Sequence, residues 1–299
     1  MTTLTSLVGR FVARFVARIA TPLLPAAAAL ALPLTLAAPG VFAPSAPAHA
    51  QMVSNCQAIA RALPGSLFVP VSTQRANPKF EVEITYVGHA TFMITAADGT
   101  SIATDYSGFH GEGPLPTVVT MNHAHITHWT PNPNPEIQHV LRGWNPEGGK
   151  AEHFLTVGEV LIRNVPTDIR RWSGGIEENG NSIFIFEIAG LCIGHLGHLH
   201  QPLSDGQIAE IGRLDVVFVP IDGGYTMPHE EMMSVVERLR TSVAIPMHWF
   251  SRQNLTRFLM RSREAGLEID IRQDPTIRVS LNTLPRAPTM VVLPRQHPF

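Results

Sequence analysis

The stretch TVVTMNHAHITH, residues 117–128, joins a short apolar run to three histidines, His123, His125 and His128. The apolar part is typical of a buried strand. In an extended segment, positions i and i+2 face the same way, so His123 and His125 can converge on one ion. His128 can turn back toward them if a helix starts there. The stretch therefore predicts a metal site at the end of a buried strand.

Two further stretches place histidines directly after apolar runs. They are CIGHLGHLH (192–200), which holds His195, His198 and His200, and IPMHWF (245–250), which holds His248. A lone histidine such as His248 is more often a hydrogen-bonded core residue than a ligand. Two clusters and a third strand-end histidine are harder to explain in that way, because neutral imidazole is a common zinc ligand and α/β folds build sites where strand ends converge.

The first fifty residues resemble an export signal. They contain a basic leader (Arg10, Arg14, Arg18), an alanine-rich apolar stretch (23–43), and the sequence PAHA before Gln51, with small residues at Ala48 and Ala50. Signal peptidase reads such a small-residue pattern. The alternative is a retained membrane anchor, but prolines interrupt the apolar run. We expect a signal peptide over 1–50, cleaved, and a periplasmic domain over 51–299.

Charge and cysteine usage narrow the class of protein. The predicted mature part has 24 acidic side chains and 19 lysines and arginines, the chain's 22 less the three in the leader. With no basic patch, nucleic acid is not expected as a partner. Cys56 and Cys192 are the only cysteines. An exported chain permits a disulfide between them, but two cysteines make a weak pattern, which favours two separate thiols.

The pattern of apolar and polar residues along the chain predicts a layered α/β architecture. Alternating and apolar runs from Phe80 to His195 indicate strands, with a hairpin turn at DGT (98–100). The second half alternates strands with helices expected over 205–212, 229–240 and 252–266. We expect two sheets packed together with helices outside, in one domain.

With these motifs in order, the chain resembles metallo-β-lactamase-fold proteins, in the branch similar to ascorbate-6-phosphate lactonase and N-acyl-phosphatidylethanolamine phospholipase D. The matching segments cover nearly all of the predicted mature chain: ITYVGHATFMI (84–94), ATDYSG (103–108), NHAHITH (122–128), NSIFIFEIAGLCIGHLG (181–197), DVVFVPIDGGYTM (215–227) and IPMHW (245–249). The resemblance implies a four-layer αββα sandwich and a hydrolase that uses one or two Zn²⁺ or another divalent metal.

The resemblance also implies a role for particular residues. His123 and His125 would bind one metal, His128 and His248 a second, and His198 would occupy the bridging place between them. Asp105 would lie beneath the site and hold a ligand loop, because metal-bound histidines need a partner on the other ring nitrogen. The family's separate third-motif histidine has no clear counterpart; Asp168 is the nearest candidate, and His195 and His200 stay open as ligands.

The chain departs from the family at two acidic positions. Its motif usually reads His-x-His-x-Asp-His, but Thr127 replaces this Asp, and His198 stands where an Asp commonly bridges two metals. A neutral hydroxyl is a poor zinc ligand, whereas an all-imidazole site still lowers the pKa of bound water toward about 7. On this view Thr127→Ala should cost little activity, and Thr127→Asp should strengthen a second metal site.

The sequence thus predicts an exported hydrolase in which metal-bound hydroxide attacks an ester, lactone or phosphodiester of a small-molecule substrate. His89, Asp222, Tyr225 and Trp129 adjoin the motifs and are candidate substrate contacts, although turn formation and packing explain them equally well. The alternative is a non-catalytic periplasmic metal-binding protein on the same fold. No stable membrane insertion is expected after cleavage of the signal.

Overall fold

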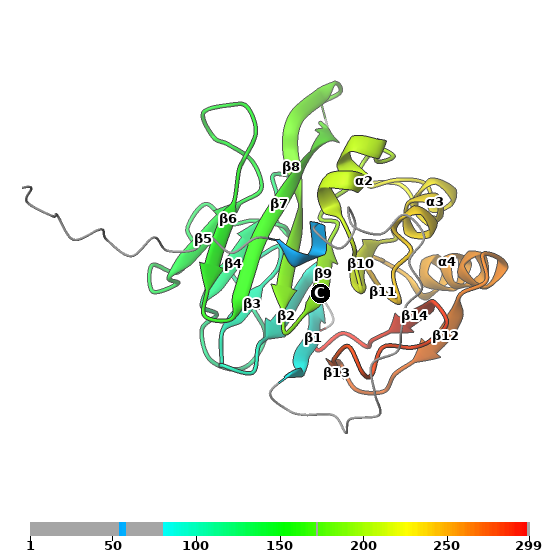
Figure 1. The fold of residues 1–299 in the computed structure, drawn as a ribbon. Coiled ribbons are helices and arrows are strands. Elements are labelled where there is room, and N and C mark those ends of the chain that lie inside the picture. The colour runs from blue at the N-terminus through cyan, green and yellow to red at the C-terminus, as the bar shows by residue number, and fades with distance from the viewer. Residues whose placement is uncertain (1–53, 58–79, 172, 298–299) are drawn as a thin grey trace, which may run out of the picture. The chain divides into compact units, whose positions relative to one another are not determined.

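The computed structural model describes residues 54–57, 80–171 and 173–297, so the predicted signal peptide over 1–50 lies outside the described residues. The described part consists of two β-sheets with helices against one of them (Figure 1). The predicted mixed α/β sandwich is confirmed. Among the described residues, no helix is both long and apolar enough to cross a bilayer.

The first sheet has six strands in the order β13-β1-β2-β3-β4-β5. Its strands are β1 (Val82–Gly88), β2 (Thr91–Thr95), β3 (Ser101–Ala103), β4 (Val118–Met121), β5 (His139–Arg142) and β13 (Thr276–Val279). β1 and β2 form an antiparallel hairpin, whereas β3, β4 and β5 run parallel. Alternate residues of β1 are fully buried, as its sequence pattern predicts for a strand with one face on a core.

The second sheet has eight strands in the order β12-β14-β11-β10-β9-β8-β7-β6. Its strands are β6 (Phe154–Val157), β7 (Val160–Arg170), β8 (Ile176–Ile188), β9 (Leu191–His195), β10 (Val216–Pro220), β11 (Val243–Met247), β12 (Glu268–Ile271) and β14 (Thr289–Val292). β9, β10 and β11 are parallel neighbours and are buried throughout. Such strands appear in the sequence as continuous apolar runs.

A core of large apolar side chains fills the space between the two sheets. Phe92 from β2 stacks on Phe218 from β10, with ring centroids 4.0 Å apart, and both rings are fully buried. Tyr86 stacks on the other side of Phe92 at 4.6 Å. Aromatic stacking of this kind adds about 0.5–1.5 kcal/mol to the burial of the rings. These contacts fix the two sheets against each other beneath the histidine-bearing loops.

Three helices pack on the outer face of the eight-stranded sheet: α2 (Asp205–Ile211), α3 (His229–Leu239) and α4 (Arg252–Glu264). All three lie where the sequence predicts helices. Ser204 caps α2 in a full capping box with Gln207, and Ser251 caps α4. On the outer face of the six-stranded sheet, Tyr106, Ile137 and Val119 form a smaller cluster with loop residues that include Trp129.

Cys56 and Cys192 form a disulfide, with Cα atoms 6.0 Å apart, so the expectation of two separate thiols was wrong. A 136-residue separation hid the proximity of the two cysteines. The bond ties residues 54–57 to β9, the strand that leads to His198. Glu187 holds the same segment, because it accepts hydrogen bonds from the Ser54 hydroxyl and the Asn55 N–H.

Candidate metal centre

The predicted site residues follow the ends of several strands in both sheets. His89 follows β1, His125 and His128 follow β4, His198 follows β9, Asp222 follows β10 and His248 follows β11. Because β9, β10 and β11 are parallel neighbours, their carboxyl ends meet at one edge of the sheet. The β1–β2 turn meets this edge from the other sheet, where the His248 N–H donates to the His89 carbonyl oxygen over 2.8 Å.

Three residues at these strand ends have left-handed backbones. The φ angles are 52° at His89, 42° at Asp105 and 55° at His248. This conformation costs non-glycine residues free energy, and such residues cluster at functional sites. The left-handed conformation turns the backbone sharply at each of these three positions.

Four histidines from these loops form one group. One ring nitrogen from each of His89, His125, His128 and His248 lies within 4.8 Å of the others, an arrangement able to hold a metal ion. The sequence predicts His125, His128 and His248 as ligands, and the structure brings them together. The sequence indicated His89 only as a candidate substrate contact. Yet His89 lies in the GHAT turn directly after a buried strand, which is the same signal that marks the other histidines.

In three of the rings, the nitrogen that faces away from the group lies within hydrogen-bond distance of a side-chain oxygen, which orients the ring. His248 Nδ1 lies 3.0 Å from Asp222 Oδ2, His128 Nδ1 lies 2.5 Å from Asp105 Oδ2, and His125 Nδ1 lies 2.7 Å from Thr127 Oγ1. When Nδ1–H donates to such an oxygen, the neutral ring keeps a lone pair on Nε2. This is the usual preparation of a histidine for metal binding.

The Nε2 atoms fit a divalent ion. His125 Nε2 and His248 Nε2 lie 3.2 Å apart, and two nitrogens bound tetrahedrally to zinc at 2.0–2.1 Å are separated by roughly 3.3 Å. The Nε2 atom of His128 is buried and has no hydrogen-bond partner among the described residues. Three imidazole nitrogens with oriented rings are the donor set of a three-histidine zinc site.

Burial keeps these histidines neutral. Burial, and then the neighbouring His248, lower the pKa of His125 to about 4. Burial, and then the neighbouring His198, hold the pKa of His128 well below its usual value. Rings that stay unprotonated at neutral pH have lone pairs free for a metal, so protons compete weakly for the site.

The carboxylate behind His248 belongs to a tight turn. Burial opposes ionisation of Asp222, but hydrogen bonds from His248, Thr226 and the backbone outweigh it and hold the pKa of Asp222 below its usual range. Its Oδ1 accepts the backbone N–H groups of Gly224, Tyr225 and Thr226. Asp222 therefore anchors His248.

His198 lies beside the group but is oriented differently. Its ring centroid is 4.9 Å from that of His125 and 4.8 Å from those of His128 and His248. Its Nδ1 faces another ring, with His200 Nε2 at 2.5 Å, rather than an oxygen. Its Nε2 is buried and has no partner among the described residues.

His123 is not brought into the group, although the sequence predicts that it shares an ion with His125. Its Nδ1 lies 2.5 Å from Glu177 Oε1, and its ring stacks on Trp144 with centroids 5.0 Å apart. The i and i+2 rule requires extended backbone, but residues 123–127 form bends and turns rather than a strand. The loop therefore turns His123 toward Trp144 and Glu177.

The three residues that the sequence left open as ligands have other partners. Asp168 accepts the backbone N–H of Asn179, and His195 is fully buried with Nε2 2.8 Å from the Ala90 carbonyl oxygen. His200 lies between His198 and Arg170. None of the three belongs to the group of four.

Thr127 has a role that the sequence did not indicate. Its hydroxyl oxygen lies 2.7 Å from His125 Nδ1 and 2.8 Å from His89 Nε2, so it joins two rings of the group. Where the family's motif has an aspartate, this chain therefore has a hydroxyl that orients the rings of His125 and His89. The expectation that Thr127→Ala costs little therefore changes.

We expect Thr127→Ala to weaken Zn²⁺ binding by about 10–100-fold, the usual cost of removing a partner behind a ligand histidine. Competition with a chromogenic chelator measures the dissociation constant. Thr127→Ser keeps the hydroxyl and should stay close to wild type. Equal Zn²⁺ affinity in the alanine and serine variants would contradict this role.

Two exposed aromatic side chains, Tyr225 and Phe250, lie beside the group, and Ile126, the residue after His125, is also exposed. Ile126, Tyr225 and Phe250 are 77%, 53% and 54% exposed. The Phe250 ring lies 5.2 Å from that of His248 and 5.5 Å from that of Tyr225, measured between centroids. Large apolar side chains left in water beside a polar centre are a feature of ligand sites.

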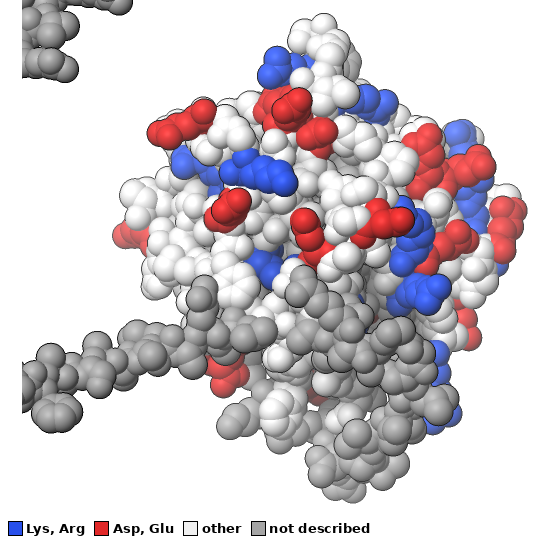
Figure 2. All heavy atoms as spheres, turned by 45° about the horizontal axis from the view of Figure 1, so that its top comes forward, with Lys and Arg blue, Asp and Glu red and all other residues white. Residues whose placement is uncertain are grey.

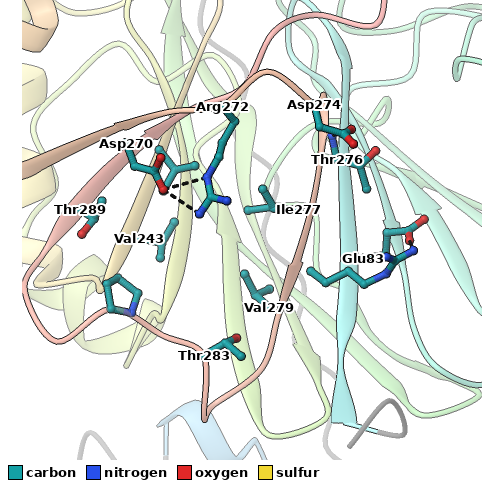
Figure 3. A pocket seen from close by; sticks show the side chains of 13 residues that line it. Glu83, Val243, Asp270, Arg272, Asp274, Thr276, Ile277, Val279, Thr283 and Thr289 are labelled. Carbon is teal, nitrogen blue, oxygen red and sulfur yellow. Dashed lines mark hydrogen bonds and ion pairs between the residues drawn. The ribbon is translucent and has the colours of Figure 1, made fainter. Parts of the chain in front are cut away.

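A cavity of about 570 Å³ lies elsewhere in the fold (Figure 3). Val243, which begins β11, lines it, whereas His248 follows the end of that strand. Its arginines are paired, Arg272 with Asp270 and Arg278 with Glu83. The cavity is therefore separate from the histidine group and holds no comparable set of donors.

The sandwich, the strand-end histidines and their oxygen partners define a protein of the metallo-β-lactamase class. Residues 83–248, more than half of the chain, match the family described as a beta-lactamase superfamily domain. The chain belongs to this superfamily.

Relatives support the same assignment. UPF0173 metal-dependent hydrolases of Methanospirillum hungatei and Methanoculleus marisnigri are each 27% identical, over 188 and 202 residues; the first match covers 56% of this chain and 83% of the relative, the second 59% and 87%. A crystal structure from Thermotoga maritima, of a proposed zinc-dependent hydrolase of the metallo-β-lactamase superfamily, is 27% identical with a TM-score of 0.54, covering 71% of this chain and 98% of that one.

Proposed function

We propose that this chain is an exported hydrolase that uses one divalent metal, zinc in the first place, to cleave esters or lactones with an apolar group. The observation that carries the proposal is the pair of facing Nε2 atoms of His125 and His248, 3.2 Å apart, with the Nε2 of His128 beside them. The relatives named as metal-dependent hydrolases support the reaction class.

The chain's own residues would hold and orient the metal. His125, His128 and His248 present Nε2, while Thr127, Asp105 and Asp222 fix the rings from behind. A bound divalent metal supplies a nucleophile at neutral pH because it lowers the pKa of water. With His125, His128 and His248 as the three protein ligands and His89 Nε2 on the Thr127 hydroxyl, a tetrahedral metal would keep one position open for chemistry.

The exposed apolar side chains near the group support an apolar substrate rather than a phosphodiester. Phe250, Tyr225 and Ile126 can cover an acyl chain beside the metal. The nearby cation Arg170 is directed to the carbonyl oxygens of residues 224–226 and to His200. On the face shown in Figure 2, acidic and basic side chains are interspersed, so that face has no field of one sign to steer anions.

We expect kcat/KM for p-nitrophenyl esters to rise with acyl length, by up to about 4-fold per methylene, from ~0.8 kcal/mol of burial each. Phe250→Ser should flatten this dependence. Phe154→Ser is the matched control, because Phe154 is similarly exposed but lies on β6. A slope unchanged by Phe250→Ser would remove the apolar-substrate proposal. If the zinc-loaded protein turns over none of a panel of esters, lactones and phosphodiesters, it is a metal-binding protein instead.

The Cys56–Cys192 disulfide supports export, because disulfides persist in oxidising compartments. We expect mass spectrometry of protein from the periplasmic fraction to show a chain that starts at Gln51, the residue after PAHA. Full-length chain confined to the cytoplasmic fraction would contradict this proposal.

A further inference from the structure

Among the described residues, two histidines beside the group form a pair in which one ring hydrogen-bonds to the other. His198 Nδ1 and His200 Nε2 lie 2.5 Å apart, and both residues are buried. One nitrogen of such a pair must carry the shared proton and the other must accept it. The direction of this bond decides which nitrogen of His198 is protonated.

The backbone of β7 sets the direction. The Arg170 N–H lies 2.9 Å from His200 Nδ1, and the Arg170 Nε–H lies 3.3 Å from the same atom. A backbone N–H is always a donor, so His200 Nδ1 must be the acceptor. The only ring proton of His200 then sits on Nε2, from which it donates to His198 Nδ1.

The reverse direction would place two donors against each other. If His198 Nδ1–H donated to His200 Nε2, the His200 proton would move to Nδ1 and would face both N–H groups of Arg170. No change of tautomer can turn the Arg170 N–H into an acceptor. Arg170 therefore donates to His200, and His200 donates to His198.

This series of hydrogen bonds leaves His198 in the opposite tautomer to His128 and His248 beside it. Its Nδ1 is an acceptor, so its proton lies on Nε2, the buried atom without a partner among the described residues. His128 and His248 instead have a carboxylate behind Nδ1. A ring that bears hydrogen on Nε2 has no lone pair there for a metal.

We propose that His198 is not a metal ligand but a hydrogen-bond donor, whose Nε2–H binds an oxygen of the substrate beside a single metal ion. The second half of this statement rests on the proposed hydrolase function, and the first half does not. His200 is a positioning residue, because it acts only by setting the tautomer of His198.

The donor would act on charge that develops during hydrolysis. When hydroxide adds to an ester or lactone carbonyl, a C–O bond forms, the C=O double bond becomes single and its oxygen becomes negative. An N–H already fixed in place stabilises that oxygen without reorganisation. The donation moves no proton, so His198 stays neutral throughout. The backbone of His198 is held in place by Asn181, whose Oδ1 accepts the His198 backbone N–H over 2.7 Å.

The tautomer can be read directly. In protein labelled with ¹⁵N on histidine, long-range ¹H–¹⁵N spectra separate protonated from unprotonated ring nitrogens, and the spectrum of His198→Gln assigns the His198 signals. We expect a protonated Nε2 and an unprotonated Nδ1 at His198, both in the apo-protein and with one equivalent of Zn²⁺. A proton on Nδ1 and Zn²⁺ on Nε2 would overturn the proposal.

Two variants of His200 test the cause. Glutamine can accept from Arg170 through its oxygen and donate to His198 Nδ1 through its NH₂ group, so His200→Gln should keep the wild-type tautomer and one Zn²⁺ per chain. Glutamate only accepts, so His200→Glu should move the His198 proton to Nδ1 and free Nε2 as a ligand. We expect Zn²⁺ bound after dialysis to rise above one per chain in His200→Glu alone; two per chain in wild type would overturn the proposal.

His198→Ala separates the donor from a ligand. If His198 is a donor, His198→Ala should still bind one Zn²⁺ per chain with unchanged affinity. Its kcat should fall by about 10²–10³-fold, as it does on loss of an oxyanion donor. A ligand's removal would lower the Zn²⁺ content, which would overturn the proposal. If wild type hydrolyses nothing, the hydrolase function fails, but the spectra and the Zn²⁺ content still decide whether His198 is a ligand.

Discussion

Replacing His128 or His248 with alanine is expected to release the metal and to abolish hydrolysis. Both side chains are fully buried, and each offers an Nε2 to the group while its Nδ1 is held by a carboxylate. Losing one of three ligands should lower Zn²⁺ affinity by more than the roughly 10–100-fold that loss of a partner behind a ligand costs. Elemental analysis after dialysis against a weak chelator measures the loss.

His123→Ala is the matched control within the same motif. Its ring stacks on Trp144 and bonds Glu177, and 37% of its side chain is exposed, so its loss should leave the Zn²⁺ content unchanged. Because alanine at a buried site also leaves a cavity, His128→Gln should be measured alongside, with circular dichroism as the check on folding. The three-histidine site would be refuted if His123→Ala lost the metal while His128→Gln kept it.

Continuous apolar runs and their bounds made most of the fold predictable. The runs at β9, β10 and β11 are long, β-rich and followed by histidine or aspartate, so both the strands and the edge where their ends meet could be expected from the sequence. The edge strands β6 and β12 were not predicted, because each is only four residues long and lies half-exposed at an end of the sheet. Tertiary pairing decides such strands, and local pattern does not.

The candidate site was predictable in composition but not in orientation. Residue type and spacing indicated His125, His128 and His248, whereas the direction of each ring depends on partners that are distant in sequence. His123 turns to Glu177, 54 residues away, and His198 turns to His200, which Arg170 orients from β7. A hydroxyl at position 127 looked like the loss of a ligand, but in the structure it supports two rings.

Asp222→Asn is expected to weaken Zn²⁺ binding by about 10–100-fold while the fold persists. The asparagine oxygen can still accept the N–H groups of Gly224, Tyr225 and Thr226, which places its NH₂ group at the former Oδ2 position. There it donates to His248 Nδ1 instead of accepting from it. The ring must then carry its proton on Nε2, the atom that would bind the metal.

The measurement combines Zn²⁺ affinity with the ring spectrum of His248. The proton should move from Nδ1 to Nε2 in the variant, and the affinity should fall with it. Asp168→Asn is the control, since Asp168 also accepts a backbone N–H, from Asn179, but faces none of the four histidines. If Asp222→Asn bound Zn²⁺ as tightly as Asp168→Asn, His248 would need no carboxylate to act as a ligand, and the tautomer logic that separates His248 from His198 would fail with it.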